Sequence, residues 1–155
     1  MKTALRSTFL KDLDQEQLEI LAPMFEPFQA PASTIIFKQG EPTSYLYFLI
    51  NGTAAIRYKP HDGSPITLTH LHPGDVFGWS AVVGNNVYTS SALATTEIET
   101  IRVHCKDLKR FCQTNPELGY IVLEKLAENV YPRWKNSREQ IRNIFGEILS
   151  QPNIK

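Results

Sequence analysis

The chain has 155 residues, with 16 basic and 16 acidic side chains and therefore no formal net charge. This length suits one domain that can bury a core without disulfides or a structural metal. The balanced charge argues against nucleic acid as the main partner, because phosphate binding needs a basic surface. No apolar stretch is long enough for a membrane span, and the first residues lack a signal-peptide pattern. We therefore expect a cytoplasmic protein without a membrane partner.

The first expected element is a helix that begins after Asp14. Asp14 is a favourable N-cap, and Gln17 stands three residues later, in the position of a capping-box partner. Leu18 begins an apolar helical face, and Pro23 and Pro27 are expected to end the helix.

From about Ala32 the pattern changes to β-branched and aromatic runs separated by turn residues. The segments TIIFKQGEP, YLYFLINGTAAIRY, ITLTHLHPGDVFG and VYTSSALATTEIETIRV predict about seven short strands. Asn51-Gly52 predicts a β-hairpin, and Pro73-Gly74-Asp75 predicts a tight turn. Short strands at this spacing indicate a sandwich or a closed roll.

The segment after the last strand has a helical period. KDLKRFCQTNP predicts a short helix, and Pro116 is well placed to begin the next one. An apolar seven-residue spacing then runs from Tyr120 to Ile148, with Pro132 predicting a kink within it. Packing on the roll would cover part of this stripe, but its later positions lie far beyond the β region. We therefore expect a homodimer through this helix, with contacts at Val130, Trp134, Ile141, Ile144 and Ile148.

Three segments, two of which contain characteristic glycines, are similar to segments of a known family. FLKDLDQEQLEILAPMFEPF is similar to the first helix, IIFKQGEPTSYLYFLINGTAAI to the central strands, and LHPGDVFG to the glycine turn of that family. With the spacing of Gly40, Gly52, Gly74 and Gly78, the chain resembles the cyclic-nucleotide-binding domain of the prokaryotic Crp/Fnr (catabolite activator) superfamily along nearly its whole length.

This resemblance implies an α+β, mainly β fold: an antiparallel β-roll (jelly roll) with an N-terminal helix and a long C-terminal dimerisation helix. We divide the chain into an N-terminal helix and β-roll sensor domain (1–115), C-terminal helices for dimerisation (116–150) and a tail (151–155). The implied function is that of a regulatory or sensor protein, and because no helix-turn-helix segment follows the last helix we expect it to be stand-alone.

The phosphate-binding cassette of the family departs from its pattern here. In nucleotide-binding members a Glu follows the FG pair, small residues face the phosphate, and an Arg comes about ten residues later, before a Ser or Thr. The resemblance places Trp79 at the Glu position, Tyr88 at the Arg position and Thr89 at the Ser/Thr position. The candidate ligand-binding residues of this degenerate cassette are Gly78, Trp79, Ser80, Ala81, Tyr88, Thr89 and Ser90.

The FGWSA stretch resembles a recurrent subgroup of the superfamily in which an Arg precedes the Tyr; here that residue is Val87. Losing two charge-assisted hydrogen bonds weakens binding by about two to four orders of magnitude. We therefore expect no standard cyclic AMP binding, no resident cofactor and no catalytic residue.

Several alternatives remain open. Backbone N–H groups around Gly78 could hold a different small-molecule or anionic effector, or Trp79 and Tyr88 could fill the pocket and leave a dimer scaffold. The chain could also be the effector domain of a transcriptional regulator. It ends without a helix-turn-helix, so we expect no direct DNA binding by this chain and a possible protein partner for its output.

A metal enzyme is the remaining alternative, because His70-x-His72 is similar to the start of a cupin metal site. The segment between Val76 and Tyr88 contains no acidic residue to complete such a site. Cys105 and Cys112 are expected to be reduced thiols.

Overall fold

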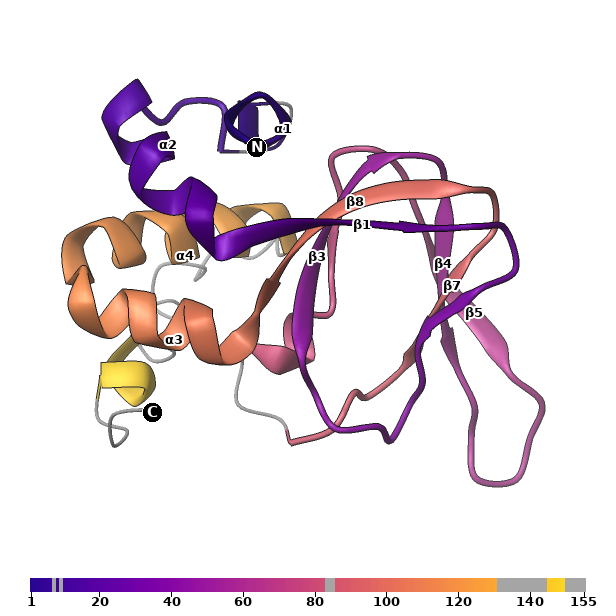
Figure 1. Ribbon diagram of the computed structural model, residues 1–155. Helices are drawn as coiled ribbons and strands as arrows, with labels where there is room; N and C mark the ends of the chain where they lie inside the picture. The colour runs from indigo at the N-terminus through magenta and orange to yellow at the C-terminus, as the bar shows by residue number, and fades with distance from the viewer. Residues whose placement is uncertain (7, 9, 83–85, 131–144, 150–155) are drawn as a thin grey trace.

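The computed structural model describes residues 1–155 except residues 7, 9, 83–85, 131–144 and 150–155. Two four-stranded antiparallel sheets form a roll (Figure 1). Sheet A contains, in spatial order, β1 (Phe25–Ala30), β8 (Ile98–His104), β3 (Tyr45–Asn51) and β6 (Val76–Phe77). Sheet B contains β2 (Ile35–Phe37), β7 (Ser91–Ala94), β4 (Ala54–Tyr58) and β5 (Ile66–Leu71).

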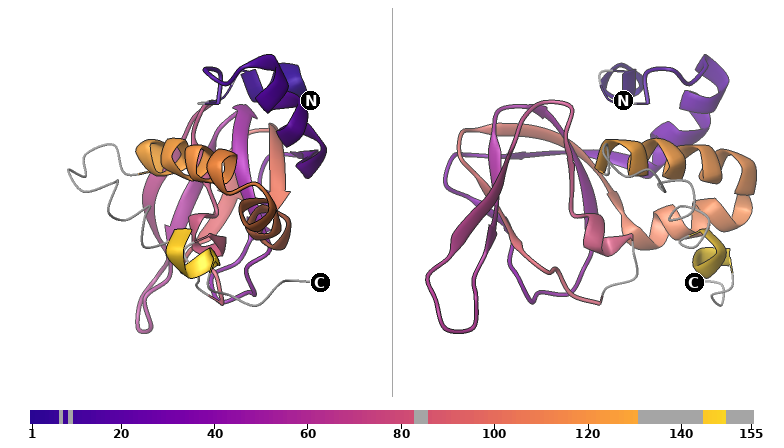
Figure 2. Two further views of the ribbon diagram at one scale, coloured as in Figure 1. Left: turned by 90° about the vertical axis from the view of Figure 1, so that its left-hand side faces the viewer. Right: turned by 180° about the vertical axis from the view of Figure 1, so that it is seen from behind.

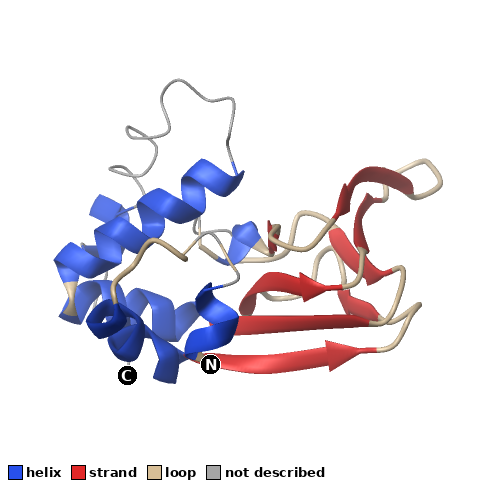
Figure 3. Ribbon diagram, turned by 90° about the horizontal axis from the view of Figure 1, so that it is seen from above, coloured by secondary structure: helices blue, strands red, loops and turns tan. Residues whose placement is uncertain are grey.

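The helices gather at one end of the roll, as Figure 3 shows. They are α1 (Lys2–Arg6), α2 (Gln15–Leu21), α3 (Cys105–Thr114) and α4 (Pro116–Val130), with a further helical turn at residues 145–149. The expected antiparallel β-roll with an N-terminal helix and C-terminal helices is confirmed. No helix within the described ranges is long and apolar enough to cross a bilayer.

The predicted capping box forms at the start of α2. The backbone N–H of Gln17 donates to Asp14 Oδ1 at 2.8 Å, and the backbone N–H of Asp14 donates to Gln17 Oε1 at 3.0 Å. A 3₁₀ turn (Ala22–Met24) then leads directly into β1, which the sequence did not predict. Pro27 lies inside β1 and does not end the helix; β1 is an edge strand, where a missing N–H is tolerated.

The hairpin predicted at Asn51-Gly52 is wrong, because β3 belongs to sheet A and β4 to sheet B. Gly52 has φ = +89°, and a Cβ at this residue would collide with the backbone carbonyl oxygen of Glu97. The dipeptide thus supplies the positive φ of a hairpin turn, but at a corner between two sheets. The turn predicted at Pro73-Gly74-Asp75 is present, and the backbone N–H of Asp75 donates to His72 O at 3.0 Å.

Two hydrophobic cores lie on the two faces of sheet A. Alternate residues of β3 enter different cores: Leu46 and Phe48 face the helices, whereas Tyr47 and Leu49 face sheet B. We call these the helical core and the roll core. Figure 2 shows α3 and α4 beside the N-terminal helices, on the side of the roll that the helical core occupies.

The apolar stripe of the C-terminal helices packs partly on the chain itself. Leu123 and Ala127 of α4 lie in the helical core. Ile148, expected at a dimer contact, is only 2% exposed in that same core, and its carbonyl accepts a hydrogen bond from Gln113 Nε2 at 3.2 Å. Its burial therefore needs no second subunit. The other predicted dimer contacts lie outside the residues whose side chains are described: Val130, Trp134, Ile141 and Ile144.

Both cysteines are buried free thiols in or beside the helical core. Cys112 of α3 lies against Gly119 of α4: a Cβ on Gly119 would stand 2.8 Å from Cys112 Cα. Burial raises the pKa of the Cys105 thiol and raises the pKa of Cys112 to about 12. Both thiols are therefore protonated at neutral pH.

Candidate functional site

The candidate cassette begins at Gly78, directly after β6. Gly78 has φ = +85°, and a Cβ at this position would lie 2.7 Å from the carbonyl oxygen of Tyr45. Only glycine fits such a backbone without a shift of β3. The chain then makes a 3₁₀ turn, Trp79–Ala81, in which Ala81 is buried.

Trp79, at the position of the family's Glu, lies on the helical side of the sheet. Its half-buried ring packs against the helical core, and Val82 of the same segment is a buried member of that core. The alternative in which Trp79 and Tyr88 fill the pocket stays untested for Trp79, because residues 83–85 of the cassette lie outside the described residues.

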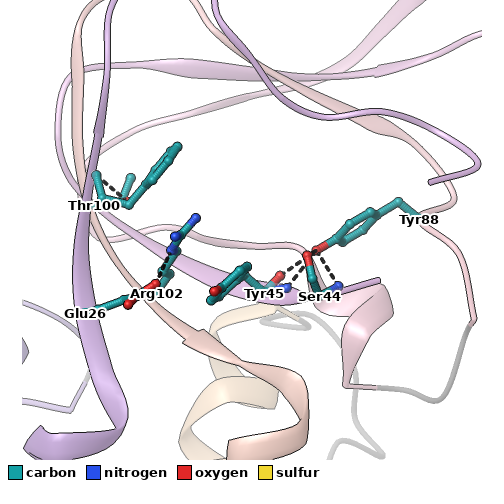
Figure 4. A network of polar contacts seen from close by, with 7 residues as sticks. Glu26, Ser44, Tyr45, Tyr88, Thr100 and Arg102 are labelled. Carbon is teal, nitrogen blue, oxygen red and sulfur yellow. Dashed lines mark hydrogen bonds and ion pairs between the residues drawn. The ribbon is translucent and has the colours of Figure 1, made fainter. Parts of the chain in front are cut away.

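Tyr88, at the position of the family's Arg, points into the molecule and is 2% exposed. Its phenol oxygen accepts hydrogen bonds from the backbone N–H groups of Ser44 (3.1 Å) and Tyr45 (2.9 Å), and donates to Tyr45 O (2.9 Å; Figure 4). A phenol has one donor and two acceptor positions, so the backbone at the start of β3 satisfies all three. Tyr88 has no further polar group to offer to a ligand.

The Tyr88 ring extends the aromatic part of the roll core. It stacks on Phe37, with centroids 3.8 Å apart and ring planes 15° apart. Behind it, Tyr47 and Phe77 stack at 5.0 Å, and Phe37 lies 6.0 Å from Tyr47. Side chains from β2, β3, β6 and the segment before β7 thus occupy the interior between the sheets. This arrangement favours the filled-pocket alternative for Tyr88.

The hydroxyl groups of Ser80 and Thr89 lie at the surface of the cassette. Ser80 Oγ and Thr89 Oγ1 are 3.2 Å apart and share a hydrogen bond, with Thr89 exposed. Ser90 is half-buried before β7. The structure therefore brings Ser80 and Thr89 together across the cassette, while Trp79 and Tyr88 contact different cores.

Arg102 of β8 is a cation of the roll that sequence reasoning missed. Its Nε donates to Glu26 Oε1 at 2.7 Å, and its guanidinium lies 3.9 Å from the ring centroid of Tyr45 and 4.5 Å from that of Phe28 (Figure 4). Burial lowers the pKa of Arg102, but bonds to Glu26 and Tyr47 outweigh it and leave the pKa above its ordinary value. The Arg102 guanidinium is therefore held by one ion pair and by contacts with two aromatic rings. Glu26 and Arg102 are far apart in sequence, so only the β1–β8 register could have revealed the pair.

The histidines do not assemble with acids or thiols into a metal site within the described part of the chain. His70 and His72 are exposed, and no group of three or more His, Cys, Asp and Glu side chains lies close enough there to hold an ion. His104 instead caps α3, because its Nδ1 accepts from the backbone N–H of Lys106 at 3.1 Å.

Together, the two sheets, the corner glycines and the cassette between β6 and β7 define a cyclic-nucleotide-binding type of β-roll. The sequence profile of the cyclic nucleotide-binding domain matches residues 27–115, more than half of the chain. The chain belongs to this family.

Among characterised relatives, the CRP-like cAMP-activated global transcriptional regulator of Mycobacterium tuberculosis is 26% identical over 147 residues, covering 94% of this chain and 66% of the regulator. A similar regulator of Pasteurella multocida is 28% identical over 74% of this chain and 53% of its own length. The chain thus spans about half to two thirds of the length of the curated relatives it matches.

A solved structure of a cyclic nucleotide-binding protein from Geobacter metallireducens has a TM-score of 0.70 at 28% identity, over 81% of this chain and 90% of that chain. A cyclic nucleotide-binding domain from Methylobacillus flagellatus has a TM-score of 0.73 at 19% identity, over 85% of this chain and 74% of that chain, which supports the fold alone.

Proposed function

We propose that the chain is a regulatory module of the Crp/Fnr type that does not bind cyclic AMP or cyclic GMP through the family's standard contacts. Family membership and the named regulators among its relatives support a regulatory role. The observation that carries the rest is the environment of Tyr88, whose hydroxyl, among the described residues, bonds to backbone atoms of Ser44 and Tyr45 and to the Ser44 side chain.

A cyclic phosphate buried in the roll would need a cation at the position that Tyr88 occupies. The Tyr88 ring stacks on Phe37, and the guanidinium of Arg102, which contacts the ring of Tyr45, is paired with Glu26. A buried anion without a partner is strongly disfavoured. The second candidate function of this site is binding of a different effector at the cassette surface. The exposed hydroxyl pair Ser80–Thr89 favours it.

The output of such a module is proposed to pass through a homodimer of the C-terminal helix or through a protein partner. The balanced charge supports an output other than direct DNA contact by this chain. The effector domain of a longer transcriptional regulator is a second candidate, favoured by the chain's match to only part of its relatives.

Calorimetric titration with cyclic AMP and cyclic GMP tests the proposal. At about 1 mM nucleotide we expect no saturable heat, whereas the related cAMP-activated regulator of Mycobacterium tuberculosis should bind under the same conditions and serves as the positive control. Micromolar binding by this chain would overturn the proposal and show that the backbone N–H groups with Thr89 suffice.

Light scattering during size-exclusion chromatography tests the dimer separately. We expect twice the chain mass, and the monomer mass for the double variant Ile141→Asp, Ile144→Asp. A wild-type monomer at tens of micromolar would remove the dimer from the proposal without affecting the nucleotide result.

A further inference from the structure

A cleft of about 750 Å³ is formed by residues of sheet B, whose strands β4, β5 and β7 are labelled in Figure 1, and by the loops next to them. Its lining contains none of the candidate cassette residues, although Ser91 at its edge directly follows Ser90. The loop after β2, the last residues of β4 with the loop that follows, and β7 form its walls. This volume falls within the range of about 300–1,000 Å³ that is usual for binding clefts.

The charge of this cleft differs from that of the surrounding chain. Residues 1–100 contain 6 basic and 10 acidic side chains, and three of those basic residues line the cleft: Lys38, Arg57 and Lys59. His61 adds a fourth basic group, and no acidic residue lines the cleft. All four side chains are exposed, and the ion pairs within the described residues do not include them.

Two carboxylates lie next in sequence to residues of the cleft, but neither belongs to its lining. Glu41 uses Oε1 to accept the backbone N–H of Lys38 at 2.7 Å, which holds it in the turn after β2. Asp62 follows His61 in the loop but does not line the cleft. The cleft therefore presents a net positive field to solvent.

The cleft also exposes apolar side chains. Ile35 is 52% exposed and Tyr58 is 38% exposed. Ile35 pairs with Leu93, and Leu93 lies on the face of β7 opposite to Ala92, which is buried in the roll core. Ile66, the cross-strand partner of Tyr58, is 50% exposed and extends this apolar surface beyond the cleft.

Hydrogen bonds hold the walls of the cleft in place. The side-chain amide of Gln39 accepts the backbone N–H of Lys59 at 2.8 Å and donates to Lys59 O at 3.1 Å. The backbone N–H of Gln39 donates to Ser91 Oγ at 2.8 Å. The loops after β2 and β4 are thus bound to each other and to β7, so a ligand would meet a cleft that is already formed.

We propose that this cleft binds a short acidic segment of a partner polypeptide that also carries an apolar side chain. Charge complementarity selects the acidic residues, and the apolar surface around Ile35, Tyr58 and Leu93 accepts the hydrophobic one. A second copy of the chain fits less well, because a two-fold contact would place the same cations opposite each other. A lipid surface contacts protruding groups, whereas these apolar groups line a concave cleft.

Selection from a displayed library of random peptides against the whole chain tests the proposal. We expect the enriched peptides to carry a net negative charge and at least one large apolar residue, and to bind more weakly as salt rises. In a ¹⁵N-correlation spectrum of the chain, one synthetic selected peptide should shift the amide signals of Ile35, Gln39, Lys59 and Leu93.

Two charge-reversal variants sharpen the test. The double change Arg57→Glu, Lys59→Glu should weaken that peptide at least about tenfold. The matched change Lys11→Glu, Lys106→Glu alters the same net charge at exposed residues outside the cleft and should change affinity less than about twofold. An unchanged melting temperature would confirm that both variants are folded.

Several outcomes would overturn this proposal. They are a failure to enrich peptides, enrichment without acidic residues, amide shifts confined to the cassette, equal weakening by both double variants, and binding to anionic vesicles in place of peptides. None of these depends on whether cyclic nucleotides bind, so the cleft and the cassette are tested separately.

Discussion

The two sheets of the roll differ in what covers them. Sheet A is packed on both faces, and four consecutive residues of β3, Leu46–Leu49, are buried because helices cover one face and sheet B the other. In sheet B, Ala54, Ala92 and Ala94 face the roll core, but five of the six residues of its edge strand β5 are exposed. The contrast indicates that sheet A carries most of the stability, whereas the outer face of sheet B is available for recognition.

Gly52 and Tyr88 connect the two sheets, and we call these two positions the seam. Gly52 turns the chain from β3 into β4, and the Tyr88 hydroxyl joins the segment before β7 to the start of β3. Backbone bonds on both sides of Tyr88, to Glu41 O and from the N–H of Gly40, connect it to the loop after β2 as well. Substitutions on either sheet and at the seam therefore have different expected costs.

Truncation in sheet A should have the largest effect. Phe48 is 1% exposed and packs edge-on against Phe25 at 5.2 Å, so Phe48→Ala should lower the free energy of unfolding by about 3–5 kcal/mol. Leu68→Ala in sheet B, where the side chain is 55% exposed, should change it by less than about 0.5 kcal/mol. Urea titration measures both, and similar losses at the two sites would contradict the contrast between the sheets.

Adding a side chain at the Gly52 corner should lower the free energy of unfolding by less than Phe48→Ala does. It should still lower it by more than the same substitution at an open turn. Gly52→Ala should destabilise by about 2–3 kcal/mol, because the positive φ is strained and the new Cβ displaces Glu97 O. Gly74→Ala is the control: its φ is +98°, but no atom lies within 4 Å of the new Cβ. Equal shifts in thermal midpoint would show that the corner has no steric constraint of its own.

Removing the Tyr88 hydroxyl tests the seam directly. Tyr88→Phe keeps the ring on Phe37 but leaves two N–H groups and one carbonyl at Ser44 and Tyr45 without this partner, which should cost about 1–2 kcal/mol. Tyr58→Phe, at an exposed residue, should be neutral in the same urea titration. If Tyr88→Phe is also neutral, the phenol is not a structural tie, and its place in the cassette would be open to a ligand.

The smallest expected effect is a pH dependence of the free energy of unfolding, which comes from Cys112 in α3. The folded chain holds the Cys112 proton more tightly than the unfolded chain, with a pKa of about 12 against an ordinary 9.0, so stability is full below pH 9 and falls as pH rises toward 12. Between about pH 8 and pH 10 the advantage of wild type over Cys112→Ala should shrink by about 1.4 kcal/mol. A constant difference across this range would show that Cys112 is accessible to solvent.

Local features of the fold could be predicted from the sequence, and long-range pairing could not. The α2 capping box is a contact between neighbours, and Asp14 with Gln17 is enough to predict it. β1 contains Pro27 and no β-branched residue, so its strand conformation depends on pairing with β8. At Asn51-Gly52 the backbone turn was predicted, but the hairpin was not formed, because the partners of β3 and β4 come from elsewhere in the chain.

The same limit applies to the candidate site. Motif spacing placed Tyr88 and Trp79 in the cassette, but their contacts with opposite faces of sheet A depend on the fold. The basic cleft was missed, because Lys38 and Arg57 are brought together by β7, which follows both of them in sequence.

The order of strands in sheet A has a consequence for how the chain folds. β8 is the central partner of both β1 and β3, pairing Phe25 with Val103 and Tyr45 with His104. Such non-local pairing is typical of domains that fold in milliseconds to seconds, because long loops must close first. On the ribosome, β1 and β3 must wait for β8 to emerge before sheet A can assemble, and until then Phe25 and Phe48 are exposed to chaperones and to aggregation.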